Sequence, residues 1–264
     1  MYAMLRGLWE YRSFIVTSIR NEFIARFARS RLGGLWMIIH PLSQVAIYAL
    51  ILSNVLAAKL PGIDNKYAYA LYLMAGVLAW NLFSEIVARC LNLFIEQGNL
   101  MKKMRFPRIA LPVIVVGSCL LNNLLLFVAV LVVFAALGQM PSLEMFWLLP
   151  LTVVVTAFAV GLGLVLGVLN VFVRDIGQVV PIILQVWFWF TPIVYSINII
   201  PDYLRGMMTG NPMFSIVNAY HDVLVYQVSP GLNELAVTVA IAFSLMLLGL
   251  FMFRRSAPEM VDAL

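Results

Sequence analysis

Apolar residues fall in long blocks along this chain, and short polar segments separate the blocks. Six blocks reach the length of about 20 residues that an α-helix needs to cross the hydrocarbon core of a bilayer. They predict six membrane-spanning helices, at about residues 35–58, 68–90, 111–137, 146–169, 178–197 and 233–253. The expected fold class is therefore an all-α integral membrane protein.

The segment 169–212 departs from this pattern. An apolar stretch of spanning length carries the aromatic run from Trp187 to Pro192, and the apolar pieces that follow are too short to cross a bilayer. Asn211-Pro212 is typical of a helix start, with asparagine as the cap and proline at the first helical position. The pattern predicts two short re-entrant or gate helices between spans five and six, over about 201–208 and 213–226.

Composition agrees with a membrane protein: 63% of residues are hydrophobic, 11% are charged, and the mean hydropathy is +0.98. Thirteen lysines and arginines lie on one predicted side of the membrane, against Lys59, Lys66 and Arg205 on the other. By the positive-inside rule, both termini are then cytoplasmic and residues 198–230 lie outside. We expect membrane lipids as neighbours and no nucleic acid partner.

Two basic segments are candidates for contacts on the cytoplasmic side. In the N-terminal arm, Ile15, Ile19, Phe23 and Phe27 recur every four residues, which predicts an amphipathic helix in the membrane interface or, equally, a basic anchor that sets topology. In the loop 96–112, cations alternate with apolar residues, which favours a docking knob over a loop that binds anionic lipid. A short helix is expected to begin near Gly98-Asn99 and to end near Phe106-Pro107.

Few residues carry candidate chemistry. Glu85 and Arg89 are spaced i,i+4 in span two, so they form either a structural pair or a substrate contact. His40 and His221 are interpreted as structural histidines, and Cys90 and Cys119 as small buried apolar residues. We find no nucleotide-binding loop, no catalytic motif and no metal site in the sequence, so the chain is not expected to be an enzyme by itself.

Several of these segments together resemble the membrane subunits of type-2 ABC exporters of bacterial surface polysaccharides, the group that includes O-antigen, capsule and teichoic-acid permeases. The resemblance covers nearly the whole chain. Its marks are Arg31 to Trp36 with Pro41, Gly76 with Trp80 and Phe83, Lys102 to Pro107, Asn170 to Asp175, Phe188 to Tyr195, and Asn211-Pro212.

The resemblance implies a homodimer in the bacterial inner membrane that forms a channel for a lipid-linked polysaccharide, most often one on polyprenyl diphosphate. Two copies of a separate cytoplasmic ATPase would bind ATP and Mg²⁺, and this chain would hold no cofactor. The implied channel-lining aromatics are Tyr48, Trp80, Phe83, Trp187, Phe188, Phe190 and Tyr195. The implied ATPase-coupling residues are Asn99, Lys102, Lys103, Arg105, Phe106 and Pro107.

Two further sets of residues complete the expected site. The cytoplasmic mouth is assigned Arg29, Arg31, Arg89, Arg174 and Asp175, where basic groups would attract a diphosphate. The periplasmic gate is assigned Tyr203, Asn211, Pro212 and Phe214. The aromatics remain open to a second interpretation, as a belt at the membrane interface.

The expected organisation is an interfacial helix over 1–32, a transmembrane domain over 33–256 and a cytoplasmic tail over 257–264. Polysaccharide export is the leading functional hypothesis. A type-2 ABC permease for a small lipophilic drug or lipid shares the six-span plan. A membrane enzyme of lipid-carrier chemistry is disfavoured, because metal–diphosphate chemistry needs clustered carboxylates.

Overall fold

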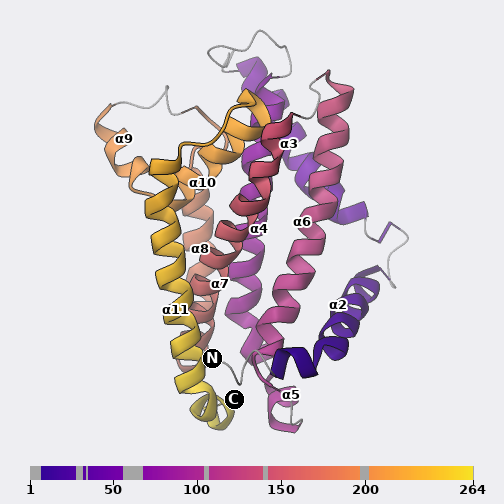
Figure 1. The fold of residues 1–264 in the computed structure, drawn as a ribbon, viewed down its shortest axis with the longest axis vertical. Coiled ribbons are helices and arrows are strands. Elements are labelled where there is room, and N and C mark those ends of the chain that lie inside the picture. The colour runs from indigo at the N-terminus through magenta and orange to yellow at the C-terminus, as the bar shows by residue number, and fades with distance from the viewer. Residues whose placement is uncertain are drawn as a thin grey trace.

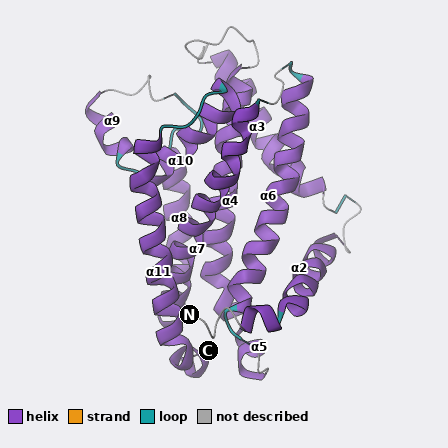
Figure 2. Cartoon of the chain, viewed as in Figure 1, coloured by secondary structure: helices purple, strands orange, loops and turns teal. Residues whose placement is uncertain are grey.

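The computed structural model describes residues 7–27, 32–33, 35–55, 68–103, 107–138, 142–196 and 202–263. All regular structure within these residues is helical (Figure 2). The helices, in chain order, are α2 (Arg12–Phe27), α3 (Leu35–Val55), α4 (Ala68–Glu96), α5 (Gly98–Lys103), α6 (Ala110–Ala136), η1 (Leu143–Trp147), α7 (Leu148–Phe172), α8 (Ile176–Trp189), α9 (Asp202–Thr209), α10 (Pro212–His221), η3 (Asp222–Tyr226) and α11 (Leu232–Ala263). The predicted all-helical class is confirmed.

The long helices form an upright bundle, and the short helices lie at its two ends (Figure 1). α5 and the C-terminal part of α11 lie at one end, which we call the α5 end, and α9 lies at the other, which we call the α9 end. Four described helices are long and apolar enough to cross a membrane: Tyr69–Glu96, Ala110–Ala136, Leu143–Phe172 and Leu232–Ala257. A total of six spans in the whole chain stays a prediction.

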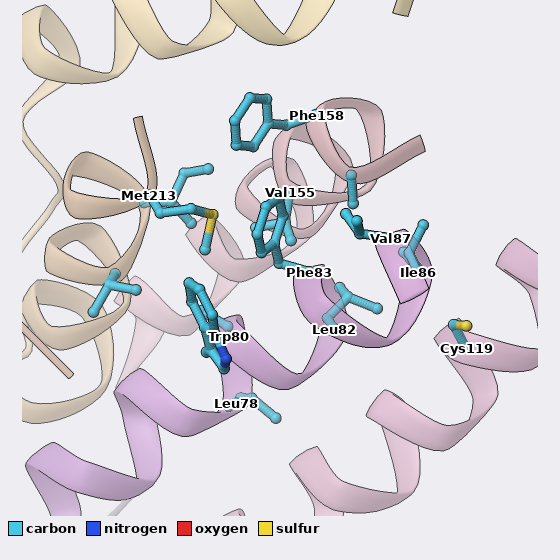
Figure 3. Close-up of a cluster of buried hydrophobic side chains, with 14 of the residues drawn as sticks. Leu78, Trp80, Leu82, Phe83, Ile86, Val87, Cys119, Val155, Phe158 and Met213 are labelled. Carbon is cyan, nitrogen blue, oxygen red and sulfur yellow. The ribbon is translucent and has the colours of Figure 1, made fainter. Parts of the chain in front are cut away.

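α4 is the centre of the bundle. It packs against α3, α6, α7, α8 and α10, and every residue from 71 to 80 is buried. A helix that is apolar on all sides can be buried on all sides, which is why α4 shows no polar face here. Phe83 stacks on Phe158 of α7 with 5.3 Å between ring centroids, and Trp80 and Met213 lie beside them (Figure 3).

Small residues set the distance between α7 and its neighbours. A Cβ atom at Gly161 would lie 2.5 Å from the backbone nitrogen of Met246, so α7 and α11 are in backbone contact there. A Cβ atom at Gly163 would lie 2.7 Å from the Cβ of Cys90 on α4. Helices inside membranes commonly associate through such small residues, because close packing replaces the hydrophobic drive that lipid cannot supply.

The fifth predicted span is shorter than expected. The sequence predicted a helix over 178–197, but α8 ends at Trp189 and the chain turns back over residues 190–196. Thr191 precedes Pro192, a position that disfavours helical backbone, and the Thr191 hydroxyl donates to the carbonyl of Trp187 at 3.0 Å. The turn therefore begins where the sequence carries its own helix-stop signal.

The C-terminal helix is longer than expected. The tail predicted over 257–264 continues α11 as far as Ala263. Met260 is fully buried, and Phe253 stacks on Phe94 of α4 with 5.3 Å between ring centroids. The side chain of Arg108 donates to the carbonyl of Ala257. The end of α11 is thus packed against the rest of the α5 end.

Candidate functional site

A cavity of about 520 Å³ lies between α3, α4, α6 and α8, and polar and apolar side chains share its lining; we call it the polar cavity because seven of its fifteen lining residues are polar. Trp36 and Ala88 are among its lining residues, and its polar lining side chains are His40, Asn81, Ser84, Glu85, Asn92, Asn122 and Asn123. From Asn81 to Asn92 the cavity follows α4 for about 16 Å, at 1.5 Å per residue, toward the α5 end. Polar side chains inside a membrane helix bundle are costly and usually serve a function, so this cavity is the candidate functional site.

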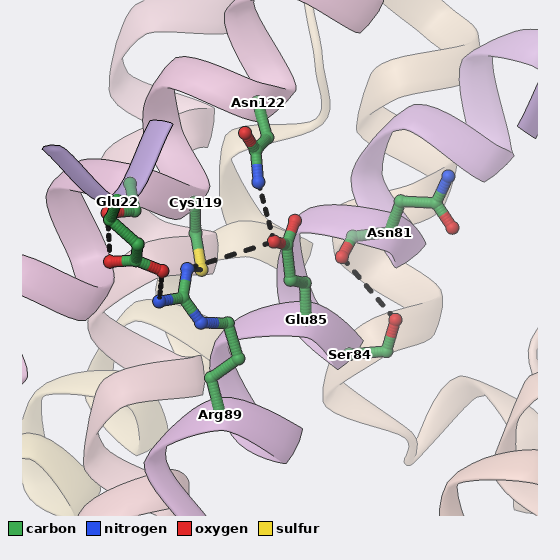
Figure 4. Close-up of polar contacts among 8 residues, drawn as sticks. Glu22, Asn81, Ser84, Glu85, Arg89, Cys119 and Asn122 are labelled. Carbon is green, nitrogen blue, oxygen red and sulfur yellow. Dashed lines mark hydrogen bonds and ion pairs between the residues drawn. The ribbon is translucent and has the colours of Figure 1, made fainter. Parts of the chain in front are cut away.

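A network of charged and amide groups joins one wall of the cavity to the N-terminal helix (Figure 4). Asn122 donates to the carboxylate of Glu85 at 2.7 Å, and Arg89 lies 3.9 Å from the same Glu85 oxygen. The other end of the Arg89 guanidinium donates to Glu22 of α2, whose second oxygen accepts from Ser118 at 2.7 Å. The predicted Glu85–Arg89 pair is confirmed, and Glu22 is its third member.

The N-terminal helix is present as α2, and its contacts are with protein. Ile15 is buried, and Ile19 packs against Gly117 of α6. In Figure 1, α2 lies obliquely beside the part of α6 near the α5 end. A place for α2 in the membrane interface stays a prediction.

The predicted channel aromatics divide into two groups. Trp80, Phe83 and Phe188 are buried and contact one another or neighbouring rings, so this arrangement gives no support to a place for them on a channel wall. Phe190 is exposed, and Tyr195 and Trp187 are half-buried. Channel lining by any of these rings stays a prediction.

Trp187 has a definite structural partner. Its ring nitrogen donates to the side-chain oxygen of Asn211 at 2.9 Å. The same Asn211 oxygen accepts from the backbone nitrogen of Met213 at 3.0 Å, and the Asn211 amide nitrogen donates to the Thr191 hydroxyl at 3.1 Å. Asn211 is therefore the cap of α10, as the sequence predicted, and it also ties α10 to the end of α8.

The turn after α8 is held by hydroxyl groups from α4. Tyr69 donates to the carbonyl of Val194, and Tyr72 donates to the carbonyl of Pro192 at 3.2 Å. These bonds supply partners for buried backbone carbonyls that are not in a helix. The turn is therefore held by hydrogen bonds from α4.

His221 of α10 also binds this part of α4. Its ring stacks on Tyr72 with 3.6 Å between centroids, and its Nε2 lies 3.1 Å from the Tyr72 carbonyl oxygen. Burial lowers the pKa of His221 to about 3, so the imidazole is neutral at physiological pH. The prediction of a structural histidine is confirmed here, whereas His40 is exposed and lines the cavity.

The predicted gate residues lie on and between the two short helices. Both helices are present as α9 and α10, and Gly210 and Asn211 join them. Tyr203 is 77% exposed, Pro212 is half-buried, and Phe214 is buried. Re-entry into the membrane and gating stay predictions.

The predicted coupling residues lie at the α5 end. α5 begins at Gly98, as expected, and the side chains of Asn99 and Lys102 are exposed. Pro107 is half-buried and lies against Gly7. The backbone of Lys103 belongs to α5, but its side chain, together with Arg105 and Phe106, lies outside the described residues.

The structure describes three of the five predicted residues of the cytoplasmic mouth, and they lie on two different elements. Arg174 and Asp175 are exposed in the turn between α7 and α8. Near this turn Asn170 is buried and donates to the carbonyl of Leu91 on α4 at 2.9 Å. Arg89 lies in the network described above. Arg29, Arg31 and the side chain of Tyr48 lie outside the described residues.

Sequence reasoning missed most of the cavity because it searched the apolar blocks for ionisable groups only. Asn81, Asn122 and Asn123 stand within those blocks, Asn92 lies two residues beyond one, and polar side chains inside a span were the available signal. Glu22 gave no local signal, since its partner Arg89 is 67 residues away.

The four described helices of spanning length and the cavity beside them define a multi-pass membrane protein with polar side chains inside its helix bundle. A family model described as ABC-2 type transporter matches residues 14–225, which is more than half of the chain. The chain belongs to the ABC-2 type transporter family.

Relatives of this chain are named for two classes of surface polysaccharide, O-antigen and polysialic acid. An O-antigen export system permease protein RfbA of Myxococcus xanthus is 28% identical over the full length of both chains. A protein of the same name from Klebsiella pneumoniae is 28% identical over 80% of each chain. A polysialic acid transport protein KpsM of Escherichia coli is 24% identical over 98% of this chain and 100% of its own length.

Proposed function

We propose that this chain is the channel-forming permease of an ATP-driven exporter that moves a lipid-linked polysaccharide from the cytoplasm to the periplasm. Polyprenyl-diphosphate-linked O-antigen is the leading substrate. Membership of the ABC-2 type transporter family and relatives named as O-antigen permeases support this proposal. The single observation that carries it is the polar cavity inside an apolar bundle.

The cavity has the chemistry that a glycan needs. Each asparagine side chain carries two N–H donors and a carbonyl acceptor. Four asparagines line the cavity, and Asn92, Asn122 and Asn123 each donate one N–H group to a protein acceptor. Sugar hydroxyls both donate and accept, so amide groups can exchange partners along a moving chain. Trp36 is 52% exposed and offers an aromatic face on the same cavity.

A homodimer and two copies of a cytoplasmic ATPase complete the proposed exporter. ATP and Mg²⁺ would bind on the ATPase, and α5 is the proposed docking knob, since Asn99 and Lys102 are exposed there. Lys102 lies on α5, Arg108 donates to the carbonyl of Ala257, and Arg254 and Arg255 lie on the C-terminal part of α11, so these cations belong to the α5 end. That distribution supports a bacterial inner-membrane protein with the α5 end and both termini in the cytoplasm.

At the opposite end, α9 and α10 are the proposed periplasmic gate. Asn211 ties α10 to α8 through Trp187, so a movement of α8 would be passed to α10. A cysteine introduced at the exposed position 203 and tethered to the partner protomer should block export without preventing assembly. Normal export from a fully cross-linked complex would contradict the proposal that α9 and α10 form a gate.

The export proposal is tested in the host by deletion and complementation. Loss of the chain should remove the surface polysaccharide and leave lipid-linked glycan on the cytoplasmic leaflet, and expression of the chain should reverse both changes. A changed drug susceptibility with normal surface polysaccharide would instead support the drug exporter. Arg174→Gln tests the mouth, because loss of a guanidinium that attracts the diphosphate should lower ATPase stimulation by the lipid-linked glycan.

A further inference from the structure

A smaller cavity of about 220 Å³ lies at the α9 end, between the α9–α10 turn, α10 and the first turns of α11. It shares no lining residue with the polar cavity, and we call it the α9-end cavity. Cavities for drug-sized ligands measure about 300–1,000 Å³, so this one suits a smaller group, of about the size of one sugar ring. It is therefore a separate candidate for a ligand site.

Two hydroxyl groups in the α9-end cavity are buried and lack a partner in the described part of the chain. Thr238 of α11 is 2% exposed, Ser215 of α10 is 8% exposed, and both line the cavity. Neither hydroxyl forms a hydrogen bond with any residue that the structure describes. Elsewhere on α11, Ser244 satisfies its hydroxyl by donating to the carbonyl of Ala240 at 2.8 Å. Buried polar groups normally have a partner, so the hydroxyls of Thr238 and Ser215 indicate a ligand.

The other lining groups fit the hydroxyls and the ring faces of a sugar. The hydroxyls of Ser215 and Thr238 can both donate and accept, as sugar hydroxyls do. The carboxyl group of Glu234, at an exposed position on the lining, is a further acceptor. Phe214 and Val237 add apolar surface for the C–H groups of a ring. A lipid acyl chain would leave both buried hydroxyls without a partner, which disfavours it as the occupant.

The α9-end cavity also borders the proposed gate. Asn211 lines the cavity, and the Asn211 side chain caps α10 and accepts from Trp187 at the end of α8. A sugar held between this turn and α11 therefore contacts the segment that joins α8, α9 and α10.

We propose that the α9-end cavity binds one sugar unit of the exported glycan at its exit, with Ser215, Thr238 and Glu234 as the groups that hydrogen-bond to the sugar hydroxyls. This inference rests on the proposed export of polysaccharide, and it adds a second site, at the periplasmic end. A bound sugar holds the α9–α10 turn against α11 while the glycan leaves.

A cysteine reporter tests the site in the full-length chain in phosphatidylcholine nanodiscs. Ser215→Cys places a thiol in the cavity, and mass spectrometry follows its labelling by methyl methanethiosulfonate, a small uncharged reagent. The probe is the oligosaccharide mixture released by mild acid from the host's own surface polysaccharide. At about ten times its Kd the probe should slow labelling about tenfold. Asn233→Cys, exposed on α11 outside the cavity, should be labelled at the same rate with and without the probe, and the wild-type chain corrects for the buried Cys90 and Cys119.

Two substitutions at Thr238 separate ligand binding from a structural role. Thr238→Val keeps the shape and removes the hydroxyl, so the Kd read from the Ser215→Cys reporter should rise about 3- to 10-fold through the loss of one hydrogen bond. Because that hydroxyl has no partner among the described residues, Thr238→Val should leave stability unchanged or higher. Thr238→Ser should restore binding. A loss of stability in Thr238→Val with unchanged protection would show a structural role instead.

Three results would overturn the proposal. Labelling of Ser215→Cys that the oligosaccharides do not slow would exclude a sugar from the cavity, and no labelling at all would show that the cavity is closed. Slow labelling in phosphatidylglycerol nanodiscs without oligosaccharide would assign the cavity to the glycerol group of a lipid. Each of these results leaves the export proposal standing, because that proposal fails only if surface polysaccharide is normal in the deletion strain.

Discussion

Asn211 offers the sharpest test of how the α9 end is assembled. Asn211→Ala removes the cap on the Met213 nitrogen and leaves the half-buried Trp187 ring nitrogen without its acceptor. Loss of a cap costs about 1 kcal/mol, and a buried donor left without a partner costs about 1–3 kcal/mol. The expected loss in the free energy of unfolding is therefore roughly 2–4 kcal/mol, because both groups depend on the same oxygen.

A conservative variant separates these terms. Asn211→Asp keeps an oxygen for Trp187 and Met213 and loses the amide bonds to the Thr191 hydroxyl and the Phe190 carbonyl, so we expect a loss of about 1–2 kcal/mol. Equilibrium unfolding in mixed detergent micelles measures both variants, and hydrogen exchange over residues 212–221 reports the loosening of α10 directly. Equal losses for the two variants, or a loss below about 0.5 kcal/mol for Asn211→Ala, would show that the Asn211 oxygen does not stabilise both Trp187 and the start of α10.

Three further predictions concern other parts of the chain. Gly161→Ala should lower stability by about 1–3 kcal/mol in the same unfolding assay, since its Cβ would meet the α11 backbone, whereas Gly206→Ala meets nothing within 4 Å and should be nearly neutral. Burial raises the pKa of Asp222 to about 6, so the folded protein binds the carboxyl proton more tightly than the unfolded chain does. The wild-type protein should therefore lose stability as pH rises from about 4 to 6, and the stability advantage of Asp222→Asn should widen over the same range. A difference that stays constant with pH would contradict this. Met260→Asp should speed hydrogen exchange over residues 98–103, because it places a charge in the buried contact of α11 with the α5 end. The control Glu259→Ala, at an exposed position, should leave that exchange unchanged.

Features that depend on neighbouring residues were predictable from the sequence. The cap at Asn211-Pro212 and the start of α5 at Gly98 are set by local backbone preferences, and both were predicted correctly. The Glu85–Arg89 pair follows from helical spacing alone. The end of α8 was missed although Thr191-Pro192 carries a stop signal, because uninterrupted apolar composition through residue 197 favoured a longer helix.

Features that depend on which helices meet were not predictable in this way. Polar residues mark one face of α4 only from Asn81 to Asn92, and the helix is apolar elsewhere. Its sequence therefore does not tell how Trp80 and Phe83 pack, and both were assigned to a channel wall although they are buried. The bond from Arg89 to Glu22 joins residues 67 positions apart. The cavity itself exists only once α3, α4, α6 and α8 are placed side by side.

If glycan passes through the polar cavity, a bulky side chain that fills the cavity should stop export. Ala88→Trp places an indole in the cavity one turn of α4 beyond Glu85, and Val132→Trp places the same ring on a 63% exposed position of α6 as the control. Surface polysaccharide and lipid-linked glycan in the membrane are measured at equal amounts of each variant. Ala88→Trp should lose surface polysaccharide and accumulate lipid-linked glycan, whereas Val132→Trp should export normally. Normal export by Ala88→Trp would contradict passage of glycan through the polar cavity.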